Sequence, residues 1–154
     1  MDKKKLALLF AAVLAGCATP PPSVPPQTLD DYKLGVAQRI VAASRETYST
    51  PVPEMLKSIV VLEITVDQAG APLEVTAFRS NGYEDLTLRA ITSVVDAAPF
   101  AAPEAALLKG AGTVSFLETF LFRDDDAFQL RTLVGDSVGH PWKSSTTSPP
   151  ASTD

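Results

Sequence analysis

The chain has 154 residues and a formal net charge of −5, and 45% of its residues are apolar. This length suits one domain with tails rather than two separate cores, and this apolar content is typical of a globular protein rather than a disordered one. Because an acidic surface repels phosphate backbones, nucleic acid is not expected as a partner.

The amino terminus has the pattern of an export signal. Three lysines at positions 3 to 5 precede an apolar run over residues 6–14, which overlaps the motif Leu14-Ala15-Gly16-Cys17. A membrane-spanning helix needs about 20 apolar residues, so this run is too short to be one. The motif resembles the lipobox of bacterial lipoprotein signals, in which a leucine and two small residues precede a cysteine. The sequence therefore predicts cleavage between Gly16 and Cys17.

The same resemblance implies that Cys17 carries a diacylglycerol and usually a further acyl chain, which would make a membrane the first partner. Ala18 follows the cysteine where an aspartate would favour the inner membrane, so we expect the periplasmic face of the outer membrane. The alternative is an ordinary buried cysteine. It is the only cysteine of the chain, so no internal disulfide can form.

Beyond the predicted signal peptide (1–16), four segments are expected up to residue 97. Residues 17–28 form a proline-rich tether. A helix begins near Thr28 or Asp30, and its stripe comprises Leu29, Tyr32, Val36, Ile40 and Ala43. Residues 58–67 and 73–79 read as a hairpin with Gly70 in its turn and with Leu73, Val75 and Ala77 facing inward. A second helix spans about residues 83–97, and Leu88, Ile91 and Val95 broaden its apolar face.

The last part of the predicted domain, 29–134, contains further strands. Residues 113–122 are the strongest strand of the chain, and a short final strand over 128–133 follows an acidic turn. From residue 135 to 154 the composition is typical of a disordered tail. The order predicts an α+β domain with a small antiparallel sheet of three to four strands and two helices on one face, wired as a split β-α-β unit.

At these residues the sequence resembles the C-terminal domains of TonB and TolA. The similarity spans roughly residues 32–133 and is carried by Gly70 in its turn and by four short stretches: Ser80-Asn81-Gly82, Ala98-Pro99-Phe100, Phe120-Leu121-Phe122 and Phe128-Gln129-Leu130-Arg131. The resemblance implies a protein-binding module that takes up an extended segment of its partner by strand addition. Candidate partners are a TonB-dependent transporter or a component of the Tol-Pal system.

The predicted docking edge is the strand over 113–122, and its candidate contact residues are Val114, Phe116, Glu118, Phe120 and Phe122. Two questions stay open at this point. The final strand either blocks this edge or simply completes the sheet. The phenylalanines either pack a core or line an apolar groove, in which case the chain would be a lipoprotein carrier or chaperone.

Groups for catalysis are sparse, so an enzyme is not expected. The single histidine, His140, lies in the predicted tail without a fixed neighbour to orient it. The only carboxylate cluster is Asp124-Asp125-Asp126, which lacks the alternating spacing of a calcium loop and reads as a solvated turn. We therefore expect neither a metal site nor a cofactor.

Overall fold

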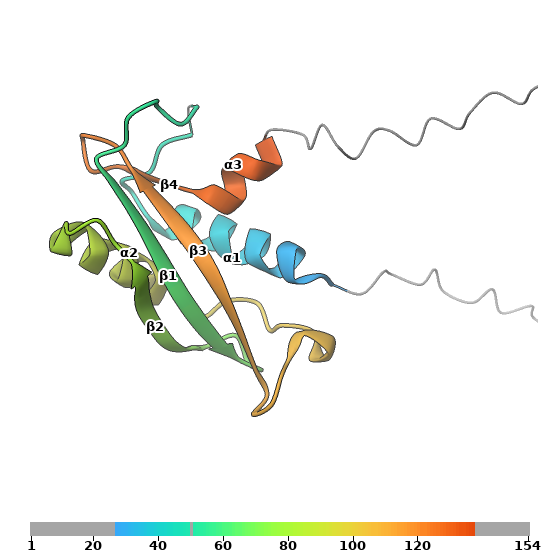
Figure 1. The fold of residues 1–154 in the computed structure, drawn as a ribbon. Helices are drawn as coiled ribbons and strands as arrows, with labels where there is room; N and C mark the ends of the chain where they lie inside the picture. The colour runs from blue at the N-terminus through green and yellow to red at the C-terminus, as the bar shows by residue number, and fades with distance from the viewer. Residues whose placement is uncertain (1–26, 50, 138–154) are drawn as a thin grey trace, which may run out of the picture.

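The computed structural model describes residues 27–49 and 51–137 (Figure 1). The signal segment 1–16, Cys17, most of the tether and His140 lie outside these residues, as does the tail from residue 138. Among the described helices, none has both the length and the apolar character that crossing a bilayer requires.

The first helix, α1 (Leu29–Ala43), begins as the sequence predicts. Thr28 Oγ1 accepts a hydrogen bond from the backbone N–H of Asp31, and an Asp31 carboxylate oxygen accepts one from the N–H of Thr28. This capping box satisfies two N–H groups that the first turn of a helix leaves without partners.

The sheet has four antiparallel strands in the order β2-β1-β3-β4. Strands β1 (Ser58–Asp67) and β2 (Pro72–Arg79) form the predicted hairpin, and α2 (Glu84–Asp96) connects β2 to β3 (Thr113–Phe122). A 3-10 turn, η1 (Ala105–Leu107), lies in the connection before β3. Because β2 and β3 both run antiparallel to β1, they are parallel to each other, as a split β-α-β unit requires. The predicted α+β class is confirmed.

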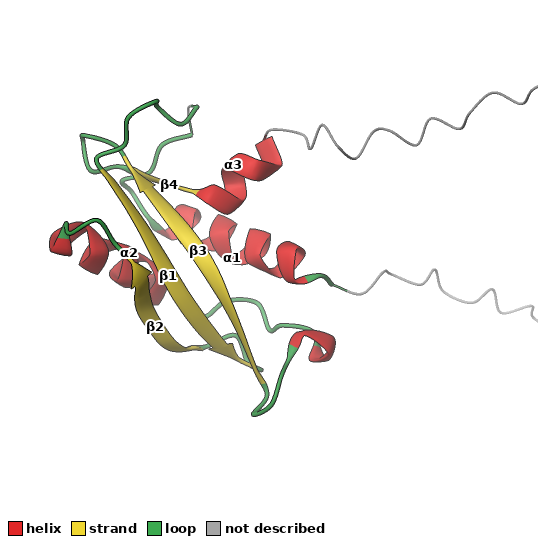
Figure 2. Cartoon of the chain, viewed as in Figure 1, coloured by secondary structure: helices red, strands yellow, loops and turns green. Residues whose placement is uncertain are grey.

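The core lies between the sheet and the helices, and α1 and α2 are behind the sheet in the view of Figure 2. Strand β1 buries alternate residues throughout, and β3 does so as far as Phe120, which is the pattern of a sheet with one covered face. The end of β3 is buried on both faces. The aromatic rings of β3 pack on Tyr32 of α1, on each other and on Phe128.

Several predicted core positions are exposed instead. Leu88 and Val95 of α2 are 63% and 52% exposed, because the helix touches the sheet only along the stripe of Leu86, Ala90 and Val94, with Ile91 partly buried beside it. Leu73 is 61% exposed, and Ala77 is exposed, since β2 is an outer strand that α2 covers incompletely. Leu29 and Ala43, at the two ends of α1, also face solvent.

The prediction of a strand over 128–133 is wrong in its second half. Strand β4 comprises only Phe128–Leu130, and the helix α3 (Arg131–Ser137) follows at once. This helix also extends three residues past the predicted end of the domain at residue 134. Alternation of apolar residues cannot distinguish a short strand from a helical turn over so few positions.

Candidate functional site

The outer edge of β3, on the side away from β1, is the feature of the structure that best fits a binding role. Strand β4 pairs only with the last three residues of β3, in the register Phe120 to Leu130 and Phe122 to Phe128. Among the described residues, no strand lies beside the segment from Val114 to Thr119 on this side. Unpaired backbone at a sheet edge is a template for strand addition.

The hydrogen bonds at the two ends of β3 show which backbone groups face outward. Thr113 exchanges backbone hydrogen bonds with Lys109 (2.8 and 3.3 Å), and the N–H of Arg123 donates to Ala127 (2.9 Å). Backbone groups of successive strand residues alternate between the two neighbours. The N–H and C=O groups of Ser115 and Leu117 therefore face the outer edge.

The five side chains predicted to contact a partner all lie on the covered face of β3. Val114, Phe116, Glu118, Phe120 and Phe122 face the core and are at most 6% exposed. A partner at this edge would meet backbone and the side chains of the open face, which are those of Ser115, Leu117 and Thr119. The sequence alone could have predicted these three residues, because side chains alternate along a strand: if the phenylalanines face the core, Ser115, Leu117 and Thr119 face outward.

Other parts of the sheet edges are closed or irregular. The outer side of β4 is bridged by Thr47, where Tyr48 N–H donates to Phe128 (3.1 Å) and Phe128 N–H donates to Glu46 (3.0 Å). Strand β2, at the opposite edge, has two register shifts against β1, whereas β3 pairs with β1 over ten residues in continuous register. Because bulges twist an edge and interrupt its ladder, β3 offers the more regular template.

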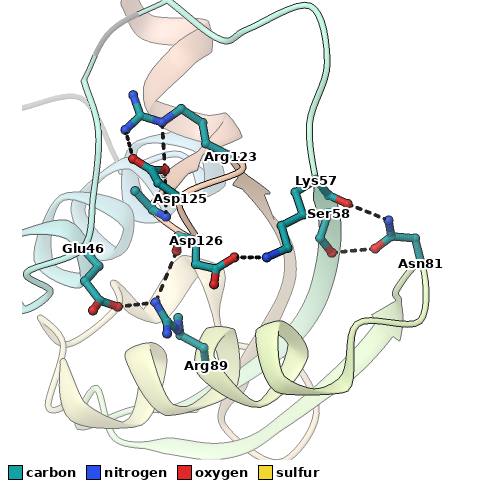
Figure 3. A network of polar contacts seen from close by, with 9 residues as sticks. Glu46, Lys57, Ser58, Asn81, Arg89, Arg123, Asp125 and Asp126 are labelled. Carbon is teal, nitrogen blue, oxygen red and sulfur yellow. Dashed lines mark hydrogen bonds and ion pairs between the residues drawn. The ribbon is translucent and has the colours of Figure 1, made fainter.

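A polar network holds the turn between β3 and β4 against the rest of the domain (Figure 3). Lys57 Nζ lies 2.6 Å from a carboxylate oxygen of Asp126, and Arg89 of α2 pairs with Glu46 and donates to the backbone oxygen of Asp126 (3.3 Å). Asn81 accepts from Ser58 Oγ and donates to the backbone of Lys57. These contacts fix β4 in place, which is a structural role.

The predicted acidic turn has ordinary ion-pair chemistry. A hydrogen bond from Arg123 lowers the pKa of Asp125, and a hydrogen bond to Asp126 raises the pKa of Lys57. Arg123 also lies 4.6 Å from the ring centre of Tyr48, and burial raises the pKa of that tyrosine. Within the described residues, no three His, Cys, Asp or Glu side chains gather as metal ligands.

A surface groove of about 600 Å³ lies between the end of α1 and α2. Charged side chains of both signs line it, including Arg45, Glu46, Asp85, Arg89 and Asp96, with Leu88 and Phe128 as its main apolar residues. The phenylalanines of β3 do not line it. The observation that motivated an apolar carrier groove is therefore accounted for by core packing.

No protein-family model, no curated protein and no solved structure matches this chain.

Proposed function

We propose that this chain is a lipid-anchored interaction module of the bacterial envelope, similar in kind to the C-terminal domains of TonB and TolA. It binds the extended segment of an envelope protein by strand addition to β3. The observation that carries the proposal is the unpaired, regular outer edge of β3 between Val114 and Thr119. The predicted split β-α-β order of the strands supports the resemblance.

The proposed location follows from the amino-terminal motif. Cys17 carries the lipid, and Ala18 after it favours the periplasmic face of the outer membrane. A TonB-dependent transporter or a Tol-Pal component is then within reach of the domain. The role is binding rather than catalysis, because the chain has one histidine and one cysteine and its described acidic turn is paired with Arg123 and Lys57.

Site-specific photo-crosslinking tests the proposal. A benzophenone amino acid at Leu117, whose side chain is 41% exposed beside the edge, should form one discrete protein adduct in intact envelopes. The same probe at Leu88, which is 63% exposed on α2, is the matched control and should not form it. Adducts of equal yield at both positions would contradict docking at β3.

A backbone variant then tests strand addition itself. Ser115→Pro removes an outward-facing N–H, and proline is tolerated where that N–H faces solvent on an edge strand. We expect the adduct from Leu117 to disappear while the melting temperature stays within a few degrees of the wild type. Ser115→Ala keeps the N–H and should keep the adduct. A proline variant that folds and still forms the adduct would exclude strand addition at this position.

A further inference from the structure

Glu118 is the one charged side chain among the buried residues that the structure describes. It lies on the covered face of β3 between Phe116 and Phe120, and it is 2% exposed. It belongs to none of the three ion pairs seen among the described residues, and its Oε2 has no hydrogen-bond partner there. Burying a charge without a counter-ion costs stability, so core packing does not explain this residue.

The position of Glu118 is where the pairing of β4 with β3 stops. In the observed register, Phe120 lies opposite Leu130. One further step of the same ladder would place Arg131 opposite Thr119, and the next would place Thr132 opposite Glu118. Instead the chain leaves the sheet at Leu130 and begins α3 at Arg131.

A single oxygen of Glu118 accepts two hydrogen bonds, one of which takes the place of a longer β4 while the other supports α3. Oε1 accepts from the backbone N–H of Thr119 (2.9 Å), which is the outward-facing donor that a longer β4 would use through Arg131. The same atom accepts from the N–H of Thr132 (3.3 Å), in the first turn of α3, where helical N–H groups lack intrahelical partners. The carboxylate therefore replaces the next strand rung and supports the helix that takes its place.

We infer that Glu118 is the residue that ends β4 and thereby keeps the edge at Leu117 open for a partner. Without this acceptor, residues 131–133 continue β4 along β3 and cover that edge with the chain's own backbone. The inference rests on the proposed function for its biological meaning, but its structural claim can be tested without any partner.

Amide hydrogen exchange of the full chain, followed residue by residue by NMR, is the direct test. In the wild type the N–H groups of Ser115 and Leu117 should exchange quickly. Glu118→Met keeps a long side chain but removes the acceptor, and exchange at Leu117 should slow by roughly a hundredfold or more as the new rungs form. Ser115 lies beyond the reach of residues 131–133 in the same register, so its exchange should stay fast and serves as the internal reference. Glu118→Gln keeps an oxygen acceptor in the same place and should behave as the wild type does.

A second variant separates Glu118 from the helix itself. Gly135→Pro interrupts α3 but leaves Glu118 in place, and the Ser115 and Leu117 amides should still exchange quickly. If Gly135→Pro alone protects Leu117, the helix and not Glu118 keeps the edge open, and the inference is overturned. Fast exchange at Leu117 in a folded Glu118→Met variant overturns it as well. If Glu118→Met loses cooperative unfolding, the same measurement uses Glu118→Thr, because the threonine side chain is too short to reach Thr132.

Partner binding gives an independent readout. The crosslinked adduct from Leu117 should fall at least severalfold in Glu118→Met and persist in Glu118→Gln. Slowed exchange with an unchanged adduct would uphold the role of Glu118 in ending β4 and would place the partner elsewhere, against the proposed function. Fast exchange in Glu118→Met would overturn the role of Glu118 in ending β4, whereas an adduct in the wild type would still support the proposed function.

Discussion

At the scale of single residues, Gly70 is the position where the backbone leaves least freedom. It turns the chain from β1 to β2 with φ of 86°, and its carbonyl accepts a hydrogen bond from the N–H of Phe100 (2.9 Å). A Cβ atom added here would lie 2.2 Å from the backbone oxygen of Phe100. The hairpin turn and the loop after α2 therefore meet at a distance that only glycine allows.

Gly70→Ala should reduce the free energy of unfolding by about 3 kcal/mol, because it combines positive-φ strain with a backbone clash. Gly82→Ala is the matched control, since Gly82 has φ of 95° but nothing within 4 Å of an added Cβ. It should cost only about 1 kcal/mol. Urea unfolding of both variants measures the difference, and equal losses would mean that the approach of the Phe100 backbone has no energetic consequence.

At the scale of elements, α2 shows how narrow the contact of a helix with a small sheet is. Leu86, Ala90 and Val94 are at most 1% exposed, and Ile91 packs partly buried beside them. Leu88 and Val95 have the same apolar character but face solvent. Hydrophobicity alone thus overestimates the width of the buried stripe.

Ile91→Asp should lower the free energy of unfolding by about 3 kcal/mol, because it places a charge against the apolar core. Leu88→Asp introduces the same side chain one turn earlier on the exposed surface and should change stability by no more than about 0.5 kcal/mol. Thermal or urea unfolding distinguishes them. A variant of Ile91 that melts like the wild type would show that Ile91 does not pack against the core.

The elements also show what the sequence could and could not predict. Long periodic segments such as residues 58–67 and 113–122 match the observed strands, as does the order of strands, because many positions repeat the same signal. The first helix begins as predicted but ends at Ala43, before Pro51, where the sequence predicts its end. The failure at residues 131–133 has a different origin. Whether this segment forms a strand or a helix depends on hydrogen bonds with Glu118, which is fourteen residues away from Thr132 in the chain.

The candidate site was predicted as an element but not as a set of side chains. Residues 113–122 form the expected strand, whose last three residues pair with β4 while no strand lies beside its first part on that side. The predicted contact residues within this strand are mostly apolar. Their side chains pack into the core, so a partner cannot reach them. Strand addition uses backbone groups, whose direction depends on the parity of the register and cannot be read from composition.

At the scale of the whole molecule, the proposed anchoring depends on one side chain. Cys17→Ser should abolish incorporation of a labelled fatty acid and leave an uncleaved or differently cleaved precursor, because serine lacks the thiolate that accepts the lipid. Fatty-acid labelling together with intact mass measures both effects. Ala18→Ser, next to the motif, should leave labelling unchanged. A Cys17→Ser protein that still partitions into membranes with the mass of the wild-type product would refute the anchor.

Removing the carboxy-terminal part of the chain should have a sharply position-dependent effect. Phe128 and Leu130 are 1% and 0% exposed, so β4 is part of the core and is not a strand that a partner could displace cheaply. Deleting residues 128–154 should therefore abolish cooperative unfolding, whereas deleting 138–154 should leave it intact. Calorimetry of the two truncated chains checks this. A folded, cooperative 1–127 chain would contradict the packing of β4.

The bridge between Thr47 and Phe128 also limits the stoichiometry of self-association. A sheet with two long regular edges can add a copy at each end, and such head-to-tail addition continues without limit into fibres. In this chain the outer side of β4 is closed by Thr47, and β2 is interrupted by two register shifts. Only the stretch from Val114 to Glu118 remains regular and without a strand neighbour on its outer side among the described residues, so copies that meet through it use up their single site and stop at pairs.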